Sequence, residues 1–399
     1  MKQQESAAFR SAIALCAAGA EKAVSNEIKK LGLAVADSGF GRVRFKADLA
    51  GLYRALIALR TADRVLLEAG LFPAGDFDAL FEGTLAVPWE SLVPARLGLK
   101  VAKVRANRSR LKAATSVQAV VHKAAAQRLC KSSGLARLPE TGAAAEVRVY
   151  IEKDTVSLLL DLSGEPLFKR GYRKEGGVAP LRETTAATML LLSGWKRKYP
   201  LYDPFCGSGT ILAEALMFAW DLAPGLGRRF AMENLLLADE TIDKAARDEF
   251  RGKVNLGRRV RIAGSDADER SAAIASANLR RTLALAQGPQ AEAAGEPVPQ
   301  ALPEVKTLSL HAARPPLDAI GDGGFIVTNP PYGKRLGSPE ASEQTYREMG
   351  VLARRFPGWK LAVVTDHSGF ESFFGRKANS CREITSGPIP SYIFQYDKL

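Results

Sequence analysis

The chain of 399 residues is long enough for two or three domains, and its 46% hydrophobic and 25% charged residues are typical of a globular protein. No apolar run approaches the roughly 18 residues of a membrane span, and four scattered cysteines argue against a disulfide framework or a zinc site. We therefore expect a cytoplasmic protein without a metal. The net charge of +13 lies entirely within the first 200 residues, which favours a polyanionic partner.

The first 60 residues follow a β-α-β order. Apolar residues around Ile13 predict a strand, the spacing over 21–30 predicts a helix, and residues 41–45 predict a second strand. Residues 49–59 again have helical spacing. This order is typical of a small ferredoxin-like unit, which we place at residues 1–65.

A dense run of cations follows this unit. Eleven Lys and Arg residues and no acidic residue lie between Glu90 and Glu140. Five of them are the candidate phosphate ligands: Lys103, Arg105, Arg108, Arg110 and Lys112. The alternation around the first two predicts a strand, and a helix is predicted over 116–130. A solvated charged face is the alternative interpretation, but so many uncompensated charges favour a nucleic-acid-binding domain, placed at residues 66–165.

A glycine turn opens the second half. The segment from Asp203 to Thr210, Asp-Pro-Phe-Cys-Gly-Ser-Gly-Thr, follows a short apolar strand and precedes a predicted helix over 210–220. Gly207 and Gly209 allow a tight turn close to a ligand, and the free N–H groups of the helix start favour a negative or polar group. A Gly-x-Gly turn can equally serve packing, and this one is neither a Walker loop nor a dinucleotide fingerprint. Asp203 favours binding, because a carboxylate at a strand end can hold an ammonium.

A second acidic strand end is Asp266, which closes the predicted strand 260–266. A carboxylate at this place suits a ribose diol, as in dinucleotide-binding folds. The alternative is an N-cap for a helix over 267–281. Residues 221–259 are long enough for a helical insertion, and residues 286–303 have the composition of a mobile loop.

A third strand, predicted over 324–328, ends at Asn329-Pro-Pro-Tyr332. The Asn329 amide oxygen and the Pro330 carbonyl can both accept hydrogen bonds from one –NH₂ group, which exposes the nitrogen lone pair. Tyr332 offers an aromatic face on which a base can stack. A plain turn is the alternative. Because ligands bind beyond the carboxyl ends of strands in open α/β sheets, this segment and the glycine turn are expected to form two halves of one site, for a nucleotide-like cofactor and an amine-bearing base.

Together the two motifs resemble those of class I S-adenosylmethionine-dependent amino-methyltransferases. Residues 167–184 (LFKRGYRKEGGVAPLRET) and 329–336 (NPPYGKRL) resemble THUMP-containing RNA methyltransferases, and the chain is similar over essentially its whole length to the bacterial 23S ribosomal RNA guanine-N2 methyltransferase family. The resemblance implies an α/β, Rossmann-like class I methyltransferase domain at residues 166–399. A ferredoxin-like and THUMP α+β RNA-binding region would precede it.

The resemblance also implies roles for single residues. Seven would bind S-adenosylmethionine: Glu183, Asp203, Phe205, Gly207, Gly209, Asp266 and Ser309. Asn329, Pro330 and Tyr332 would hold the target base, and no metal would take part. The family usually has an acidic residue near the cofactor adenine, and in this chain Ser309 is the candidate substitute. The implied partner is 23S ribosomal RNA or a ribosome assembly intermediate.

Three other functions remain open from the sequence. One is guanine-N2 methylation of transfer RNA, and another is adenine-N6 methylation of DNA, because Asn-Pro-Pro-Tyr fits adenine equally well. The basic first half argues for RNA over DNA. The third is a noncatalytic RNA-binding assembly factor, against which the intact Asn329, Pro330 and Tyr332 argue.

Overall fold

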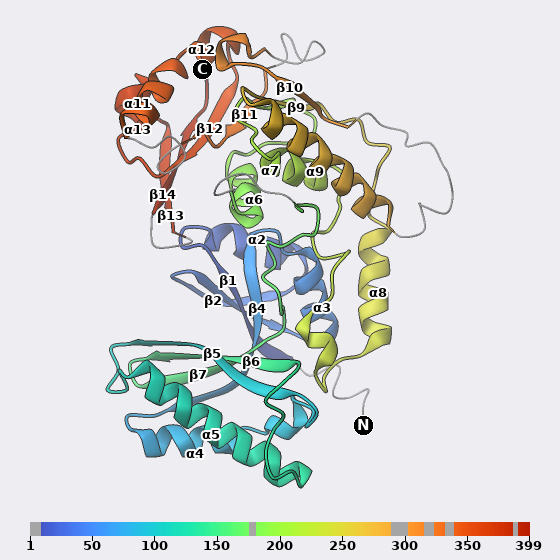
Figure 1. Cartoon of the computed structure of the whole chain (residues 1–399), viewed down its shortest axis with the longest axis vertical. Coiled ribbons are helices and arrows are strands. Elements are labelled where there is room, and N and C mark those ends of the chain that lie inside the picture. Colours follow the sequence, from blue (N-terminus) through green and yellow to red (C-terminus); the bar gives the residue numbers. More distant parts are fainter. Residues whose placement is uncertain (1–8, 175–180, 289–301, 315–322, 332–338, 386–389) are drawn as a thin grey trace.

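Two seven-stranded sheets organise the computed structural model of the chain (Figure 1). The structure describes residues 9–174, 181–288, 302–314, 323–331, 339–385 and 390–399. The first sheet is formed by the N-terminal part of the chain and the second by the C-terminal part, as the sequence predicts. Within these ranges, no helix combines the length and apolar character that crossing a membrane requires.

The N-terminal sheet has the strand order β2-β3-β1-β4-β7-β6-β5. Its strands are β1 (Arg10–Cys16), β2 (Ala34–Gly39), β3 (Arg42–Ala47), β4 (Ala62–Pro73), β5 (Gly98–Asn107), β6 (Ala144–Glu152) and β7 (Thr155–Asp161). Its helices are α2 (Glu21–Lys30), α3 (Leu49–Ala58), α4 (Phe77–Ala86) and α5 (Ala114–Ser133), with a 3-10 turn η1 (Trp89–Ser91). Every described strand pair is antiparallel except β5 with β6.

Local sequence explains these elements. Along β6 every second side chain is buried, because alternate residues face opposite sides of a sheet. Helix α3 begins at Asp48, whose carboxylate accepts the Gly51 N–H. Helix α5 ends at Gly134, which takes a left-handed conformation that a residue with a Cβ rarely adopts. The predicted strands and helices of this half are therefore confirmed within a few residues.

Strand β4 joins the two N-terminal units. It pairs with β1 on one side and with β7 on the other. The expected division between residues 65 and 66 falls inside this strand, so the ferredoxin-like part and the segment that follows share one continuous sheet. The three-domain division itself stays a prediction.

The C-terminal sheet has the order β10-β9-β8-β11-β12-β14-β13. Its strands are β8 (Leu201–Asp203), β9 (Ile262–Asp266), β10 (Glu304–Thr307), β11 (Phe325–Thr328), β12 (Lys360–Thr365), β13 (Ser380–Ile384) and β14 (Ser391–Tyr396). The first five are parallel, and β13 and β14 add an antiparallel edge. The order reverses between β8 and β11, which marks the topological switch point of a Rossmann-like domain. This confirms the predicted fold class.

The C-terminal half of the chain also contains several helices. They are α6 (Glu183–Leu192), α7 (Thr210–Ala219), α8 (Glu240–Arg251), α9 (Glu269–Gln287), α11 (Pro339–Glu348), α12 (Val351–Arg355) and α13 (Phe370–Phe374), with 3-10 turns η2 (Ala231–Asn234) and η3 (Leu310–Ala312). Helix α8 lies within the predicted helical insertion at 221–259. Helix α9 extends to Gln287, so the predicted loop at 286–303 begins later than expected, and its residues 289–301 lie outside the described residues.

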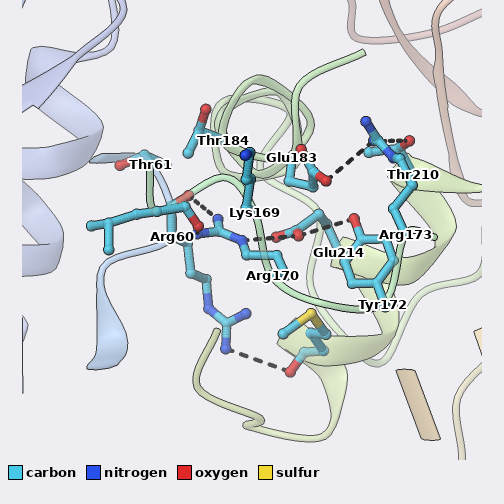
Figure 2. A network of polar contacts seen from close by, with 12 residues as sticks. Arg60, Thr61, Lys169, Arg170, Tyr172, Arg173, Glu183, Thr184, Thr210 and Glu214 are labelled. Carbon is cyan, nitrogen blue, oxygen red and sulfur yellow. Dashed lines mark hydrogen bonds and ion pairs between the residues drawn. The ribbon is translucent and has the colours of Figure 1, made fainter. Parts of the chain in front are cut away.

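A buried polar network joins the two halves (Figure 2). The side chains of Arg170 and Glu214 are 1% and 0% exposed and pair at 3.3 Å between Nε and Oε1. Arg170 also donates to the backbone carbonyl of Arg60 in the N-terminal half, and the Tyr172 hydroxyl donates to Glu214 Oε1. The two halves also meet through helices, because α2 packs on α6 and α3 packs on α8. The segment between the sheets is therefore anchored on both sides.

Removing one partner of this pair is expected to be costly. Glu214→Ala leaves the Arg170 charge buried without its carboxylate, so the free energy of unfolding should fall by about 3–5 kcal/mol. Urea-induced unfolding monitored by circular dichroism measures the change. The double variant Arg170→Met/Glu214→Leu is the matched control and should be less destabilised, because it removes both charges of the pair together. Equal losses in both variants would show that the uncompensated charge is not the cause.

Candidate functional site

The two sequence motifs meet at the carboxyl ends of neighbouring parallel strands. β11 pairs directly with β8, with Phe325 opposite Leu201. At the ends of these strands the Thr328 hydroxyl donates a 2.6 Å hydrogen bond to Asp203 Oδ1, although the two residues are 125 positions apart. The tertiary structure thus brings the glycine turn and the Asn-Pro-Pro segment together, as expected from their places at strand ends.

The glycine turn is held by the end of β9. Gly207 and Gly209 have φ angles of +51° and +77°, where a Cβ is disfavoured. A Cβ on Gly209 would also lie 2.9 Å from the Cβ of Ala275 in α9, so this glycine serves close packing. The Gly207 N–H donates to Asp266 Oδ2 at 2.9 Å. Gly209 is thus packed on α9 and does not line the cavity described below, whereas Gly207 does; a ligand-binding role for the turn stays a prediction.

Asp203 is a buried acid at the floor of the site. Only 1% of the residue is exposed. Burial raises the pKa of its carboxyl to about 7, against the lowering effect of hydrogen bonds from the Thr328 hydroxyl and the Phe205 N–H; the negative charge of Asp266 raises it further. Ionisation at this position is costly unless a cation arrives. The carboxyl is thus suited to a positively charged ligand group.

Asp266 acts differently from the helix cap that was its alternative role. Helix α9 begins later than predicted, and its N-cap is Asp268, whose carboxylate accepts the N–H groups of Arg270 and Ser271. The N-cap interpretation of Asp266 is therefore wrong. Its two oxygens accept the N–H groups of Gly207 and Asp268, and each retains acceptor capacity toward the cavity.

These strand ends enclose a cavity of about 500 Å³. Five predicted site residues line it: Asp203, Phe205, Gly207, Asp266 and Asn329. Asn329 is 8% exposed, and its side-chain oxygen is buried and accepts no hydrogen bond within the described part of the chain. A buried, unsatisfied acceptor is unfavourable in the free protein. It is therefore a candidate for binding a donor supplied by a ligand.

Ser309 and Pro330 lie beside the cavity. Ser309 follows Leu308 and precedes Leu310, both of which line it, and Pro330 lies between the lining residues Asn329 and Pro331. Tyr332 lies outside the described residues, so its stacking role stays a prediction.

Glu183 lies in the buried network instead of the cavity wall (Figure 2). Its Oε1 lies 3.5 Å from Arg173 Nη2. Burial is the main cause that raises the pKa of the Glu183 carboxyl. Arg173 Nη2 also donates to the Leu181 carbonyl at 2.8 Å and to Thr210 Oγ1 at 2.6 Å. Leu181 and Thr210 line the cavity. Glu183 thus connects with the cavity through Arg173.

Several lining residues were not identified from the sequence. Leu308 and Leu310, on either side of the candidate Ser309, provide apolar surface, and Asp268, Ser271 and Ile274 line the cavity from α9 and its cap. The spacing of three residues in the last group is the period of one helix face. That spacing after the strand end could have revealed them.

The candidate phosphate ligands lie on β5 and in the loop that follows it. Lys103 and Arg105 are exposed on β5, which confirms the predicted strand. Arg108, Arg110 and Lys112 follow in the loop before α5 and line an open basin of about 800 Å³. Figure 1 shows β5 and α5 at the opposite end of the molecule from β10 and β11. Any RNA that reaches both sites must therefore extend along the protein.

Comparison with known families gives two matches. Residues 170–393 match the UPF0020 family model, described as an RMKL-like methyltransferase domain. Residues 11–66 match the RlmL ferredoxin-like domain. The first match covers the catalytic sheet with the cavity, and the second covers β1 to the start of β4.

Individual relatives cover nearly the whole chain. YpsC of Bacillus subtilis (strain 168), named as a candidate RNA methyltransferase, is 35% identical over 96% of this chain and 95% of its own. The ribosomal RNA large subunit methyltransferase K/L of Syntrophotalea carbinolica is 31% identical over 95% of this chain. The chain spans only 52% of the latter protein, and 50% of the K/L methyltransferase of Allochromatium vinosum.

Solved structures give the same picture. SMU.472, crystallised in complex with SAH, superposes with a TM-score of 0.85 at 32% identity and covers 98% of both chains. A protein of Listeria monocytogenes str. 4b F2365, described as a predicted N6-adenine-specific DNA methylase, superposes with a TM-score of 0.86 at 35% identity over 99% and 98% of the two chains. SAH is the product that remains when S-adenosylmethionine gives up its methyl group. A homologue therefore binds the product form of the expected cofactor, S-adenosylmethionine.

The unusual ionisation of Asp203 leads to a stability prediction. Its folded pKa is raised above the unfolded value near 3.8, so ionisation destabilises the fold as pH rises from about 4 to about 7. Asp203→Asn removes this cost. Between pH 5.5 and 7 the variant should therefore gain about 2 kcal/mol over the unmodified protein, and the gain should level off about one pH unit above the folded pKa.

Urea-induced unfolding at a series of pH values measures this difference without any ligand. Asp397→Asn, which removes an exposed carboxylate from the same domain, is the control and should show little pH-dependent gain. A flat difference between pH 5.5 and 7 for Asp203→Asn would contradict the burial penalty.

Proposed function

Since this chain belongs to the UPF0020 family of RMKL-like methyltransferases, we propose that it transfers a methyl group from S-adenosylmethionine to the exocyclic N2 amine of a guanine in 23S ribosomal RNA. The names of YpsC and of the K/L enzymes support RNA, and ribosomal RNA in particular. Because the chain spans about half of the K/L enzymes, their full activity is not transferred to it. The base and the RNA are parts of the proposal.

The observation that carries the proposal is that Asp203 and Asn329 line the same cavity. A cation would stabilise the ionised form of the buried Asp203 carboxyl, and a hydrogen-bond donor would satisfy the buried Asn329 oxygen. A methyl donor with an ammonium group and an acceptor with an amine satisfy both needs. The Thr328–Asp203 hydrogen bond holds Asp203 to the end of β11, one residue before Asn329.

The residues of the cavity fit S-adenosylmethionine. Asp203 would hold its ammonium, the free oxygen lone pairs of Asp266 would accept the ribose hydroxyls, and Leu308 and Leu310 would pack against the adenine. When bound, S-adenosylmethionine supplies an electrophilic methyl group. The backbone of the glycine turn can lie close to the ligand because Gly207 has no Cβ.

The Asn-Pro-Pro segment would position the accepting amine. Asn329 Oδ1 and the Pro330 carbonyl would each accept one N–H, which directs the nitrogen lone pair into the cavity. Positioning of this kind replaces an entropically costly encounter with a fixed geometry. The amine loses its proton after the methyl transfer, so a dedicated general base is not required. Tyr332 would stack on the extruded base.

The N-terminal half would supply the RNA affinity. We propose the division into a ferredoxin-like unit at residues 1–65, a THUMP domain at 66–165 and the methyltransferase domain at 166–399. In this arrangement Lys103, Arg105 and the loop cations contact RNA phosphates, and the catalytic domain reads only the target base.

Adenine-N6 methylation of DNA is the second candidate. The description of the Listeria protein favours it, and Asn-Pro-Pro accepts from an adenine amine as readily as from guanine. The decisive experiment is a single-turnover assay with labelled S-adenosylmethionine, undermodified 23S ribosomal RNA, transfer RNA and duplex DNA, followed by mass spectrometry of the nucleosides. We expect N2-methylguanosine from ribosomal RNA. N6-methyl-2′-deoxyadenosine from the duplex DNA, without methylated guanosine from RNA, would replace the proposal with the second candidate.

The amine contact leads to a catalytic prediction. Asn329→Ala removes one of two acceptors, and losing one preorganised contact of this kind costs on the order of 10²–10³ in rate. Single-turnover transfer measures the rate, and calorimetry should show unchanged affinity for S-adenosylmethionine. Gln344→Ala, which removes an exposed amide on α11, is the matched control and should transfer at the normal rate. Normal transfer by Asn329→Ala would refute the proposed role.

Asp203 leads to a prediction for the cofactor. Asp203→Asn cannot provide a negative charge, so S-adenosylmethionine should bind at least about tenfold more weakly, the factor expected for about 1.4 kcal/mol. Calorimetry of the purified variant measures the affinity. The same variant is expected to be more stable without ligand, so weak binding cannot be attributed to unfolding. Unchanged affinity would place the ammonium elsewhere.

A further inference from the structure

The loop with the phosphate-ligand candidates is attached to the turn between β6 and β7. The Lys153 N–H donates to the Asn107 carbonyl at 3.1 Å. Asp154 then accepts three hydrogen bonds from the loop: from Ser109 Oγ at 2.8 Å, from the Arg110 N–H at 2.8 Å and from Arg110 Nε at 3.0 Å. One carboxylate therefore sets both the backbone and the side chain of Arg110.

Gly75 completes this arrangement. A Cβ at residue 75 would lie 1.6 Å from Arg110 Nη2, so the guanidinium rests directly against the glycine backbone. The Ala74 N–H donates to the Asp154 carbonyl at 2.7 Å, which fixes Gly75 beside the same turn. The position of the Arg110 side chain thus depends on a glycine in one segment and an acid in another.

The fixed loop leaves its cations available. The Arg110 side chain is 73% exposed, and its terminal nitrogens make no hydrogen bond to any residue that the structure describes. Arg108 has a left-handed φ of +49°, a conformation that costs energy unless the surroundings impose it. With Lys112 they place three positive charges against the single negative charge of Asp154 around the basin. This surplus of donors and charge matches a phosphodiester backbone.

We propose that this basin is a preorganised phosphate-binding site for RNA and that Asp154 and Gly75 are its positioning residues. The proposal rests on the proposed function, which supplies the RNA, and deepens it by assigning roles to an acid and a glycine. Asp154 would repel phosphate if charge alone mattered. Hydrogen bonds from the Arg110 and Ser109 groups lower the pKa of its carboxyl, so it remains ionised and keeps the loop in place.

The opposing effects of charge and order make the test sharp. Asp154→Asn removes a negative charge, so an electrostatic surface without preorganisation would bind RNA more tightly. Asn also tolerates the left-handed φ of +58° at this position, so the turn is retained. We expect weaker binding instead, by about 3- to 10-fold, because the Arg110 side chain must then be ordered on binding.

Two further variants complete the experiment with the full chain and 23S ribosomal RNA transcribed in vitro. Gly75→Ala leaves the charge unchanged but displaces Arg110, so it should weaken binding and lower the salt slope by about one. Glu146→Gln, on β6 and paired with Lys100, removes the same charge as Asp154→Asn without touching the loop. Its affinity should be unchanged or slightly higher.

The outcomes separate the two proposals. Affinity that is unchanged or higher in Asp154→Asn would overturn the positioning role, and so would an equal loss in Glu146→Gln. If the unmodified protein fails to bind the RNA at low salt, that result would overturn both the proposed RNA substrate and the proposed phosphate-binding basin. Calorimetric binding of S-adenosylmethionine by each variant confirms that the catalytic domain is intact.

Discussion

The parallel pairing of β8 with β11 is the constraint on which the site depends. The strand order reverses at this pair, which leaves the carboxyl ends open for a ligand. The hydrogen bond from Thr328 to Asp203 then holds a buried acid beside the Asn329 amide. A shift of either strand would separate the half that suits the cofactor from the half that suits the amine.

The site retains polar groups that the free protein does not satisfy. Burial raises the pKa of the Asp203 carboxyl, and the Asn329 oxygen accepts no hydrogen bond within the described residues. Such groups persist because the surrounding packing is extensive, and a ligand that satisfies them binds more tightly for that reason. The same groups therefore lower the stability of the free protein and increase its affinity for a ligand that satisfies them.

The N-terminal half is more than an appended binding module. β4 makes its two parts one sheet. Arg170 contacts the Arg60 carbonyl just before β4 and pairs with Glu214 of helix α7, whose start lies at the cavity. The loop of Arg108 and Arg110 is set in turn by contacts from residues 75 and 154. The phosphate-ligand candidates and the catalytic cavity thus lie at opposite ends of a continuous framework (Figure 1).

The sequence alone determined the fold class and most of the cavity floor, because strand periodicity, glycine turns and strand-end acids are local signals. Asp203, Gly207 and Asp266 could be found in this way. The tertiary structure decided the rest: that Asp268 and not Asp266 caps α9, that Glu183 meets Arg173 in a buried network, and that Asp154 holds Arg110. These contacts join residues whose separation in the chain carries no periodic pattern, so only the packing of distant segments defines them.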